Sequence, residues 1–525
     1  MKKVILLCMT ALLVSFNLKA ADIYVSPTTG SDSNNGSLAA QLKTIETAVF
    51  SVKDNIQTTI HIENNSIITV GAILNFGQNK KVAIVGKNVT IKAAALPGQK
   101  DPSGLPLLGQ GNRIIQALDN CDLKVTGITF QNGRQVGYVP GGAIYFTGNT
   151  LVVDSCKFID NQAGSCGGAI GARALSVSVK NSYFQGNNIL GGGARGAAIM
   201  QAGPATGTTK GTLSVQNCTF YNNTTQTDGY GFVINIYDSS LGTEGGKYSN
   251  TSKLEVTNCT FLQNSSVTHY MAAIDVSDGE CDAYLVNNTF YNNSECAFRL
   301  SMNKAYLANN VIVGGKQGIM SNNKVVDGNR PEIIGINNIV VGTEGGINTG
   351  IDDACFNSAK SANNNVVSTT AAYPIGAVSL ASSLSTDNFV PYLAITSANS
   401  TLVDAGIENS LALFGANYVL PVDIKGKLTS NKKDIGAYEY NGITGFSSPE
   451  YIAENYRISQ SGNTFTVKNI ADKSFSMNIV NMMGKVVYST QASSSVEFSK
   501  NKFGQGVFIL LLNDGTKISS KKILF

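Results

Sequence analysis

A short unit recurs through the middle of the chain and constrains the fold more than any other feature. Five copies place an asparagine three residues after a phenylalanine, and the clearest two, at Phe158 and Phe184, are followed by a small-residue stretch ending in isoleucine. Successive phenylalanines are separated by 28, 26, 36, 41 and 29 residues (Phe130, Phe158, Phe184, Phe220, Phe261 and Phe290). These intervals are too long for hairpins and fall within the period of stacked solenoids. Short alternating strands broken by Asn and Gly, with no helical run between them, predict that each copy is one turn of a parallel β-helix.

The physics of stacking explains which residue types recur. Turns that stack at the strand spacing of about 4.8 Å bring equivalent side chains above one another. Phenylalanine rings can then pile in the core, and asparagine amides can bond along a ladder at a bend. Cys156, Cys218 and Cys259 each lie two residues before a phenylalanine, so we predict buried, packed thiols there, with disulfide or metal roles as the alternative. Cys281 could form a disulfide with Cys296 or with Cys166, but the sequence cannot assign the pairing.

The beginning of the chain has the features of a secretory signal. Two lysines follow the first methionine, an apolar run extends to Phe16, and small residues stand at Ala20 and Ala21. This pattern predicts that residues 1–20 are a signal peptide. The apolar run is too short to span a bilayer comfortably, and no second apolar segment of that length occurs, so no transmembrane helix is expected.

Composition excludes two other classes of protein. With 43% hydrophobic and 14% charged residues the chain is too apolar for disorder. The net charge is only +4, without a basic stripe or a P-loop. We therefore expect no nucleic-acid partner.

The remaining chain divides into two structural parts. Residues 21–440 carry the β-helix pattern, and Leu42, Ile45, Val49 and Val52 fall at the spacing of an amphipathic helix that would cap the open end of the coil. Residues 441–463 are read as a linker and the start of a C-terminal domain. Residues 464–525 alternate apolar and polar positions between glycine-containing turns, which predicts a small antiparallel β-sandwich. The fold class is thus all-β, a parallel β-helix with a capping helix followed by a sandwich.

Two stretches of the long part resemble a known group. Residues 24–27 and 30–36 resemble the opening of bacterial pectate-lyase-like right-handed parallel β-helix proteins, and residues 404–406 and 434–439 resemble the closing signature of that group. The resemblance implies a right-handed coil. The Phe-x-x-Asn and Gly-Gly-Ala-Ile units are also similar to the repeats of chlamydial polymorphic outer-membrane proteins, although those end in a membrane barrel that the C-terminal pattern here does not match.

The C-terminal segment resembles the type A sorting domain of the Bacteroidetes type IX secretion system. The matching stretches are residues 478–488, 504–509 and the closing Lys521-Lys522-Ile523-Leu524. The resemblance implies export to the cell surface or extracellular space, with the type IX machinery as partner. The alternative is a small sandwich that binds carbohydrate or another protein.

The predicted binding face is the outer side of the strands that contain the repeated isoleucines, each of which follows a small-residue stretch. Aligning Ile144, Ile170, Ile199, Ile234 and Ile274 places one outward row at Tyr145, Met200, Asn235 and Asp275 and a second at Thr147, Arg173, Ala202, Tyr237 and Ser277. Inserts at residues 203–211 and 238–253 would border this face. A groove there could hold a polysaccharide or host-surface glycan, with the following predicted ligand-binding residues: Tyr145, Arg173, Asn235, Tyr237 and Asp275. The alternative is a solvated outer sheet with ordinary loops.

Catalysis would need a base and a cation as well as a groove. The candidate catalytic residues are Arg173, Tyr237, His269 and Asp275, with Arg195 nearby. Calcium could bind an acidic run of hard oxygen ligands, or the same run could supply a glycosidase carboxylate pair (Asp275, Asp278, Glu280 and Asp282). The spacing of this run matches no standard calcium loop, and no catalytic motif of pectate lyases or polygalacturonases can be matched. We therefore expect no cofactor, with calcium as the alternative.

Two functional hypotheses follow. The first is an exported, non-catalytic glycan-binding or adhesin-like β-helix, which the regular repeats and the absence of tryptophan favour. The second is a polysaccharide lyase or glycoside hydrolase working in an outer groove, which the uneven inserts favour. Convergence of the catalytic candidates in one concavity would discriminate the two.

Overall fold

A computed structural model describes most of the chain beyond residue 20. The described residues are 21–94, 112–135, 139–191, 194–204, 209–226, 229–236, 251–267, 272–276, 281–300, 304–321, 332–342, 366–368, 378–406, 423–426, 433–440, 456–461, 463–470, 473–481, 486–503, 507–513 and 518–524.

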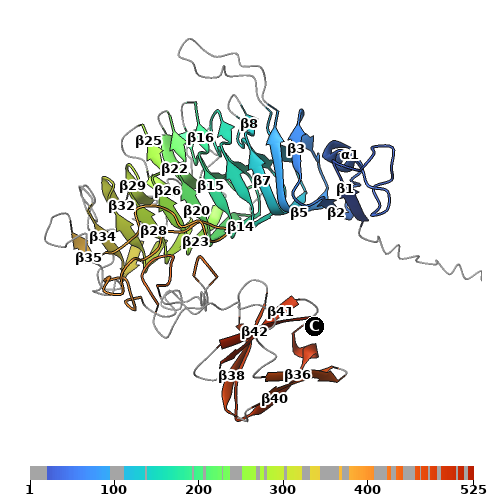
Figure 1. The fold of residues 1–525 in the computed structure, drawn as a ribbon. Helices are drawn as coiled ribbons and strands as arrows, with labels where there is room; N and C mark the ends of the chain where they lie inside the picture. Colours follow the sequence, from blue (N-terminus) through green and yellow to red (C-terminus); the bar gives the residue numbers. More distant parts are fainter. Residues whose placement is uncertain are drawn as a thin grey trace, which may run out of the picture.

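Residues 21–368 form a parallel β-helix, as the repeats predict (Figure 1). The long sheet follows two sides of the coil. Its first ladder contains β1 (Ala21–Val25), β2 (Gln57–Ile62), β5 (Lys81–Ala93), β7 (Asp122–Gln131), β10 (Thr150–Asp154), β14 (Ser176–Lys180), β19 (Gly211–Gln216), β23 (Thr251–Thr257), β27 (Asp282–Val286), β30 (Lys304–Ala308) and β33 (Glu332–Ile336). Its second ladder joins the later halves of β5 and β7 to β3 (Ile67–Val70), β11 (Lys157–Ile159), β15 (Tyr183–Gln185), β20 (Thr219–Tyr221), β24 (Thr260–Leu262), β28 (Thr289–Tyr291), β31 (Val311–Val313), β34 (Ile339–Val341) and β35 (Val366–Ser368).

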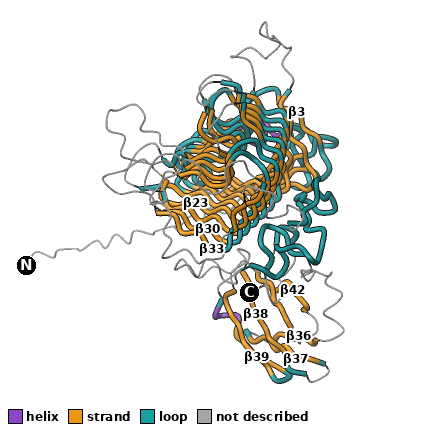
Figure 2. Tube along the Cα trace, turned by 90° about the vertical axis from the view of Figure 1, so that its left-hand side faces the viewer, coloured by secondary structure: helices purple, strands orange, loops and turns teal. Residues whose placement is uncertain are grey.

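Two further parallel sheets complete each turn. The second sheet contains β4 (Leu74–Asn75), β6 (Ile115–Ala117), β9 (Ile144–Phe146), β13 (Ile170–Ala172), β18 (Ile199–Gln201), β22 (Gly229–Ile236), β26 (Ala272–Val276), β29 (Cys296–Leu300) and β32 (Gln317–Ser321), with β17 (Ala194–Arg195) beside β22. The short sheet contains β8 (Arg134–Gln135), β12 (Gln162–Ala163), β16 (Asn188–Ile189), β21 (Thr224–Thr225) and β25 (Ser265–Ser266). Seen along the coil, the strands of successive turns superpose around the core (Figure 2).

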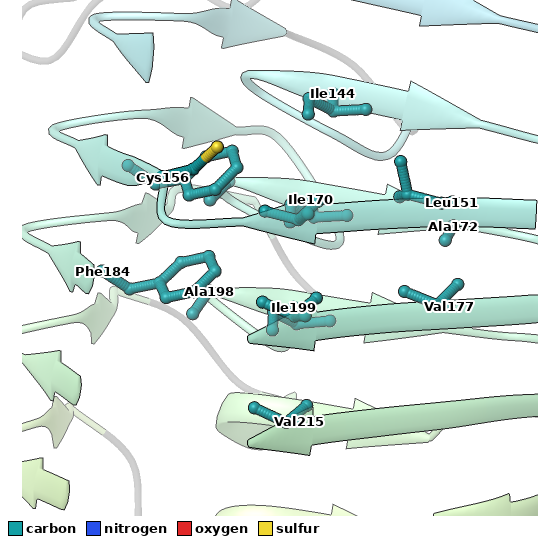
Figure 3. Close-up of a cluster of buried hydrophobic side chains, with 14 of the residues drawn as sticks. Ile144, Leu151, Cys156, Ile170, Ala172, Val177, Phe184, Ala198, Ile199 and Val215 are labelled. Carbon is teal, nitrogen blue, oxygen red and sulfur yellow. The ribbon is translucent and has the colours of Figure 1, made fainter. Parts of the chain in front are cut away.

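The phenylalanines of the repeat form one stack in the core. Neighbouring rings from Phe130 to Phe290 are nearly parallel, and their centroids are 4.4–5.2 Å apart. The strand register pairs each ring with the next one. Figure 3 shows Phe184 in the core with Ile170 and Ile199 of the second sheet. The predicted ring ladder is confirmed.

The asparagines of the repeat form a buried ladder at the next bend. Asn223, for example, donates from Nδ2 to the Phe184 carbonyl at 3.1 Å and to Oδ1 of Asn264 at 2.9 Å. Its own Oδ1 accepts from the main-chain N–H and the Nδ2 of Asn187. The pattern repeats at every turn from Asn161 to Asn293. Amide side chains therefore satisfy main-chain groups that this bend would otherwise bury unpaired.

The repeated cysteines are buried thiols, as predicted. Cys156, Cys218 and Cys259 are free and fully buried, and each thiol donates to the carbonyl two residues before it. Cys156 faces the core in Figure 3. Cys166, Cys281 and Cys296 are also free, so the disulfides considered for them are not formed.

A short helix covers the first turn of the coil. The helix α1 (Ile45–Phe50) is shorter than the segment of apolar spacing, because Thr44 accepts a hydrogen bond from Thr47 N–H as the N-cap. Ile45, Ala48 and Val49 face the core, and the flanking Leu42 and Val52 are buried beside them. The capping function expected of this segment is thus confirmed.

The described stretches 378–406, 423–426 and 433–440 pack on the outer side of the second ladder of the long sheet. The Thr219 hydroxyl donates to the Pro391 carbonyl, and Ala437 N–H donates to the Thr289 hydroxyl at 3.0 Å. The stretches that resemble a closing signature contact each other here, since Asp404 N–H donates to Oδ1 of Asp434 at 2.8 Å. Burial raises the pKa of Asp434, while main-chain donors oppose that rise.

The C-terminal part is antiparallel and has its own core. One sheet pairs β36 (Tyr456–Ser461), β37 (Thr464–Asn469) and β40 (Ser495–Ser499), followed by a 3₁₀ turn, η5 (Lys500–Lys502). The other pairs β39 (Val486–Ala492), β38 (Phe475–Asn481), β41 (Val507–Asn513) and β42 (Ile518–Leu524). Apolar residues of both sheets, among them Phe465, Met477 and Leu510, share one cluster. The predicted sandwich is confirmed, and β36 lies in the segment expected to hold its start.

Candidate functional site

The outer side of the second sheet carries a row of side chains in register. Because Ile144, Ile170, Ile199, Ile234 and Ile274 align, as expected, the next residue of each strand faces outward. The predicted row is confirmed, and the structure extends it at both ends. We call it the outer row: Gln116, Tyr145, Gly171, Met200, Asn235, Asp275, Arg299 and Met320.

Most of the outer row is buried, which the strand pattern did not predict. Met200, Asn235 and Asp275 are at most 1% exposed, although they point away from the core. The reason is local. Met200 packs against Cys166 and Ala202, and Asp275 is enclosed by its bonds to Asn235 and Arg299. A Cβ at Gly171 would lie 2.4 Å from Pro140 Cβ, so Pro140 leaves no open space over that position of the row.

Asp275 is held in a buried ion pair. Arg299 donates from Nε to Oδ1 at 3.1 Å and from Nη2 to Oδ2 at 2.9 Å. Asn235 donates from Nδ2 to the same carboxylate at 3.2 Å. Both oxygens of this carboxylate are occupied by donors and the side chain is fully buried, so it is poorly placed to take a proton from a bound sugar. The sequence did not point to Arg299, which lies 24 residues from its partner.

The acidic run is not brought together where it is described. Asp275 lies on β26 of the second sheet, whereas Asp282 begins β27 of the long sheet, in register with Lys253 and Lys304. Burial raises the pKa of Asp282, and Lys304 opposes that rise. Asp278 and Glu280 lie outside the described residues. Within the described ranges no group of three acidic, histidine or cysteine side chains could hold a metal ion, and the calcium site stays a prediction.

Tyr145 is half-buried beneath an arginine that the sequence did not single out. The Arg113 guanidinium lies 4.6 Å from the Tyr145 ring centroid. It donates from Nε to Gly141 O at 3.0 Å, from Nη2 to Pro140 O at 2.7 Å and from Nη1 to Gln116 Oε1 at 2.6 Å. Burial lowers the pKa of Arg113 to about 10, against the influence of Tyr145. One face of the tyrosine is therefore covered, and its remaining surface could contact a ligand.

A second group of polar side chains surrounds Cys166, at the bend before β13. We call Ser165, Cys166, Arg173 and Arg195 the arginine cluster. Cys166 is in register with Arg195 and packs against Met200. Burial raises the pKa of the Cys166 thiol, and the Ser165 hydroxyl and then the charges of Arg195 and Arg173 oppose that rise.

Two hydrogen-bond donors of the arginine cluster have no oxygen or nitrogen acceptor. Ser165 is 5% exposed, and its hydroxyl lies beside the Cys166 thiol, which is a weak acceptor, without a hydrogen bond of normal geometry. Arg173 is half-buried on the outer side, two residues after Gly171, and its buried Nε–H is also unpaired. Buried donors are rarely left unpaired, and such groups often mark a site for water or a ligand.

The catalytic candidates are only partly described. Tyr237 and His269 lie outside the described residues. Arg173 follows β13, and Asp275 lies three strands further along the second sheet, about 14 Å at the usual strand spacing. The described pair therefore does not form one reaction centre.

Comparisons with known proteins assign the C-terminal part. Residues 461–525 match the family described as secretion system C-terminal sorting domain. The chain is therefore sorted by type IX secretion to the cell surface or extracellular space. Among the described helices none is long and apolar enough to cross a membrane.

The β-helix has solved structural neighbours of low similarity, and no curated protein matches the chain. Pectate lyase Pel9A is 13% identical with a TM-score of 0.43, over 80% of this chain and 96% of that one. A rhamnogalacturonan lyase is 12% identical with a TM-score of 0.29, over 61% and 87%. A GH136 lacto-N-biosidase from Eubacterium ramulus is 12% identical with a TM-score of 0.19, over 60% and 67%. These values carry no argument about ligand or activity.

Proposed function

We propose that this exported protein is a non-catalytic glycan-binding or adhesin-like module that presents the outer side of its second sheet to a polysaccharide. The rigid coil positions the binding residues, and the sorting domain delivers the coil outside the cell. Tyr145 offers an aromatic surface, and Arg173 offers a guanidinium that could donate hydrogen bonds to the ligand.

One observation carries the proposal. On the outer side of the second sheet the described candidate base, Asp275, is bound by Arg299, while Tyr145 and Arg173 remain partly exposed. Groups suited to recognition are thus accessible, and the carboxylate that chemistry would need is occupied. This contrast favours binding over lyase or hydrolase action.

Binding and chemistry can be measured on the same samples. The mature chain, residues 21–525, would be run through gels containing neutral or uronate-rich polysaccharides, with and without calcium. In parallel, unsaturated uronate absorbance and new reducing ends would report cleavage. We expect retardation by at least one glycan without product.

Variants localise the binding. Tyr145→Ala and Arg173→Ala should each weaken retardation about tenfold, roughly 1.4 kcal/mol. Lys124→Ala removes an exposed charge from the long sheet and should change little. Product that disappears in Arg173→Ala or Asp275→Asn would refute a binding-only role and support the lyase or glycosidase alternative. Absence of both retardation and product would refute glycan binding.

A further inference from the structure

We infer that the arginine cluster is an oxyanion site that selects glycans carrying carboxylate or sulfate ester groups. This inference rests on the proposed function and specifies the chemical group that would be recognised. It assigns a role to Ser165 and Arg195 at the bend before the second sheet, in addition to Arg173 on its outer side.

The unpaired donors define the chemistry of the ligand. Arg173 Nε–H and the Ser165 hydroxyl can both donate, and a guanidinium N–H has no acceptor capacity. An oxyanion presents several lone pairs and can accept from both donors. A neutral hydroxyl would satisfy fewer donors and would leave the charge of Arg173 without a counter-ion. Charge-assisted hydrogen bonds are about twice as strong as neutral ones, so an oxyanion is the favoured occupant.

The surroundings strengthen the electrostatic argument. Arg195 is 7% exposed and in register with Cys166, and the charges of both Arg195 and Arg173 act on the Cys166 thiol. The rest of the immediate lining is apolar, since Cys166 packs with Met200 and Ala202. Two guanidinium groups over a dry, apolar base attract an anion more strongly than the same charges in water.

The acidic groups of the same sheet do not compete for these donors. Asp275, in the outer row, is three strands away and already paired with Arg299. No hydrogen bond joins it to Ser165 or to Arg173 Nε. An anion at Ser165 and Arg173 Nε would therefore not displace Asp275.

The direct test observes the Arg173 Nε–H itself. The mature chain would be labelled with ¹⁵N at arginine Nε, and the Arg173 resonance assigned as the one missing from Arg173→Lys. Sodium sulfate, sodium acetate and sodium chloride at equal ionic strength serve as probes. We expect sulfate or acetate, but not chloride, to shift this resonance, and Ser165→Ala to weaken the response about tenfold. An identical response to all three salts, or none, overturns the oxyanion site.

A second test separates the two sources of the oxyanion and separates this inference from the proposed function. Oligogalacturonate presents carboxylates, dextran sulfate presents sulfate esters, and dextran presents neither. We expect Arg173→Gln to weaken retention on at least one of the charged polymers at least tenfold. The matched control Lys124→Gln, with the same change in net charge on the long sheet, should weaken it less than twofold.

The outcomes are distinguishable. Equal loss in Arg173→Gln and Lys124→Gln means that only overall charge matters and overturns the site. Retention on neutral dextran but on neither charged polymer, unchanged in Arg173→Gln, also overturns it, while glycan binding stands. A resonance shift with sulfate but no retention on any polymer supports the oxyanion site and contradicts the proposed function.

Discussion

The buried asparagine ladder should contribute more to stability than any exposed asparagine, and Asn223→Ala tests this. Asn223 is fully buried at the centre of the ladder. Its Oδ1 accepts from Asn187 N–H at 3.0 Å and from Asn187 Nδ2 at 2.9 Å. Its Nδ2 donates to Phe184 O and to Asn264 Oδ1.

The magnitude follows from the groups left behind. Truncation to alanine leaves two buried donors of Asn187 unpaired, and each costs about 1–3 kcal/mol. The Asn264 Oδ1 keeps its bond from the main-chain N–H of residue 223, so it adds little. We therefore expect Asn223→Ala to lower the free energy of unfolding by about 4 kcal/mol.

Urea denaturation of the mature chain, followed by circular dichroism, would measure the loss. Hydrogen exchange of peptides spanning Asn187 would show whether the turn opens locally, because each solenoid turn contacts only its neighbours. The matched control is Asn35→Ala, which removes one exposed bond to Ser37 N–H and should cost about 1 kcal/mol or less. Equal destabilisation by the two substitutions would refute the reasoning.

Three further predictions concern other buried or bonded groups. Asp275→Ala should lower the free energy of unfolding of the coil by about 3 kcal/mol, measured by thermal denaturation. Adding Arg299→Met should recover part of this loss, because a buried charge without its partner is costlier than no pair. Destabilisation by the two substitutions that simply adds up in the double variant would contradict this. The hydroxyl of Ser26 and then that of Thr28 lower the pKa of Glu63. This carboxylate therefore stabilises the first turns at pH values above its unfolded pKa of about 4.5 and loses that contribution as pH falls through its lower folded pKa. Acid denaturation of Glu63→Gln should lack this loss of stability, and an acid denaturation curve equal to that of the unchanged protein would contradict the prediction. Burial raises the pKa of Cys156 to about 12, so a thiol reagent at neutral pH should label it only after unfolding; labelling of the native chain would show that the thiol is accessible.

Much of the β-helix could be predicted because its signal is periodic. Phe184 and Asn187 recur with the same partners in neighbouring turns, so a residue type at one repeat position implies its neighbours in space. The same logic correctly aligned Ile170 and Ile199 and placed Asp275 in the outer row. Export was also readable, since the C-terminal segment carries a local signature independent of the coil.

The candidate site was less predictable because its contacts are not periodic. Alternation told which side of a strand Asp275 faces, but not that Arg299 binds it or that Pro140 lies over Gly171. Arg113 has no sequence signal of its own, yet it covers Tyr145. The unpaired Nε–H of Arg173 depends on which acceptors the fold brings near it, and the residue pattern does not give these.

The sequence by itself thus determined the stacking, the register and the destination of this protein. Only the tertiary structure decided which outward side chains are accessible, which charges are paired and where the described stretches 378–406, 423–426 and 433–440 lie. The physical reason is that stacking repeats one local contact at every turn, whereas burial and pairing outside the core depend on single contacts between residues far apart in the chain. Such contacts leave no repeated pattern in the sequence.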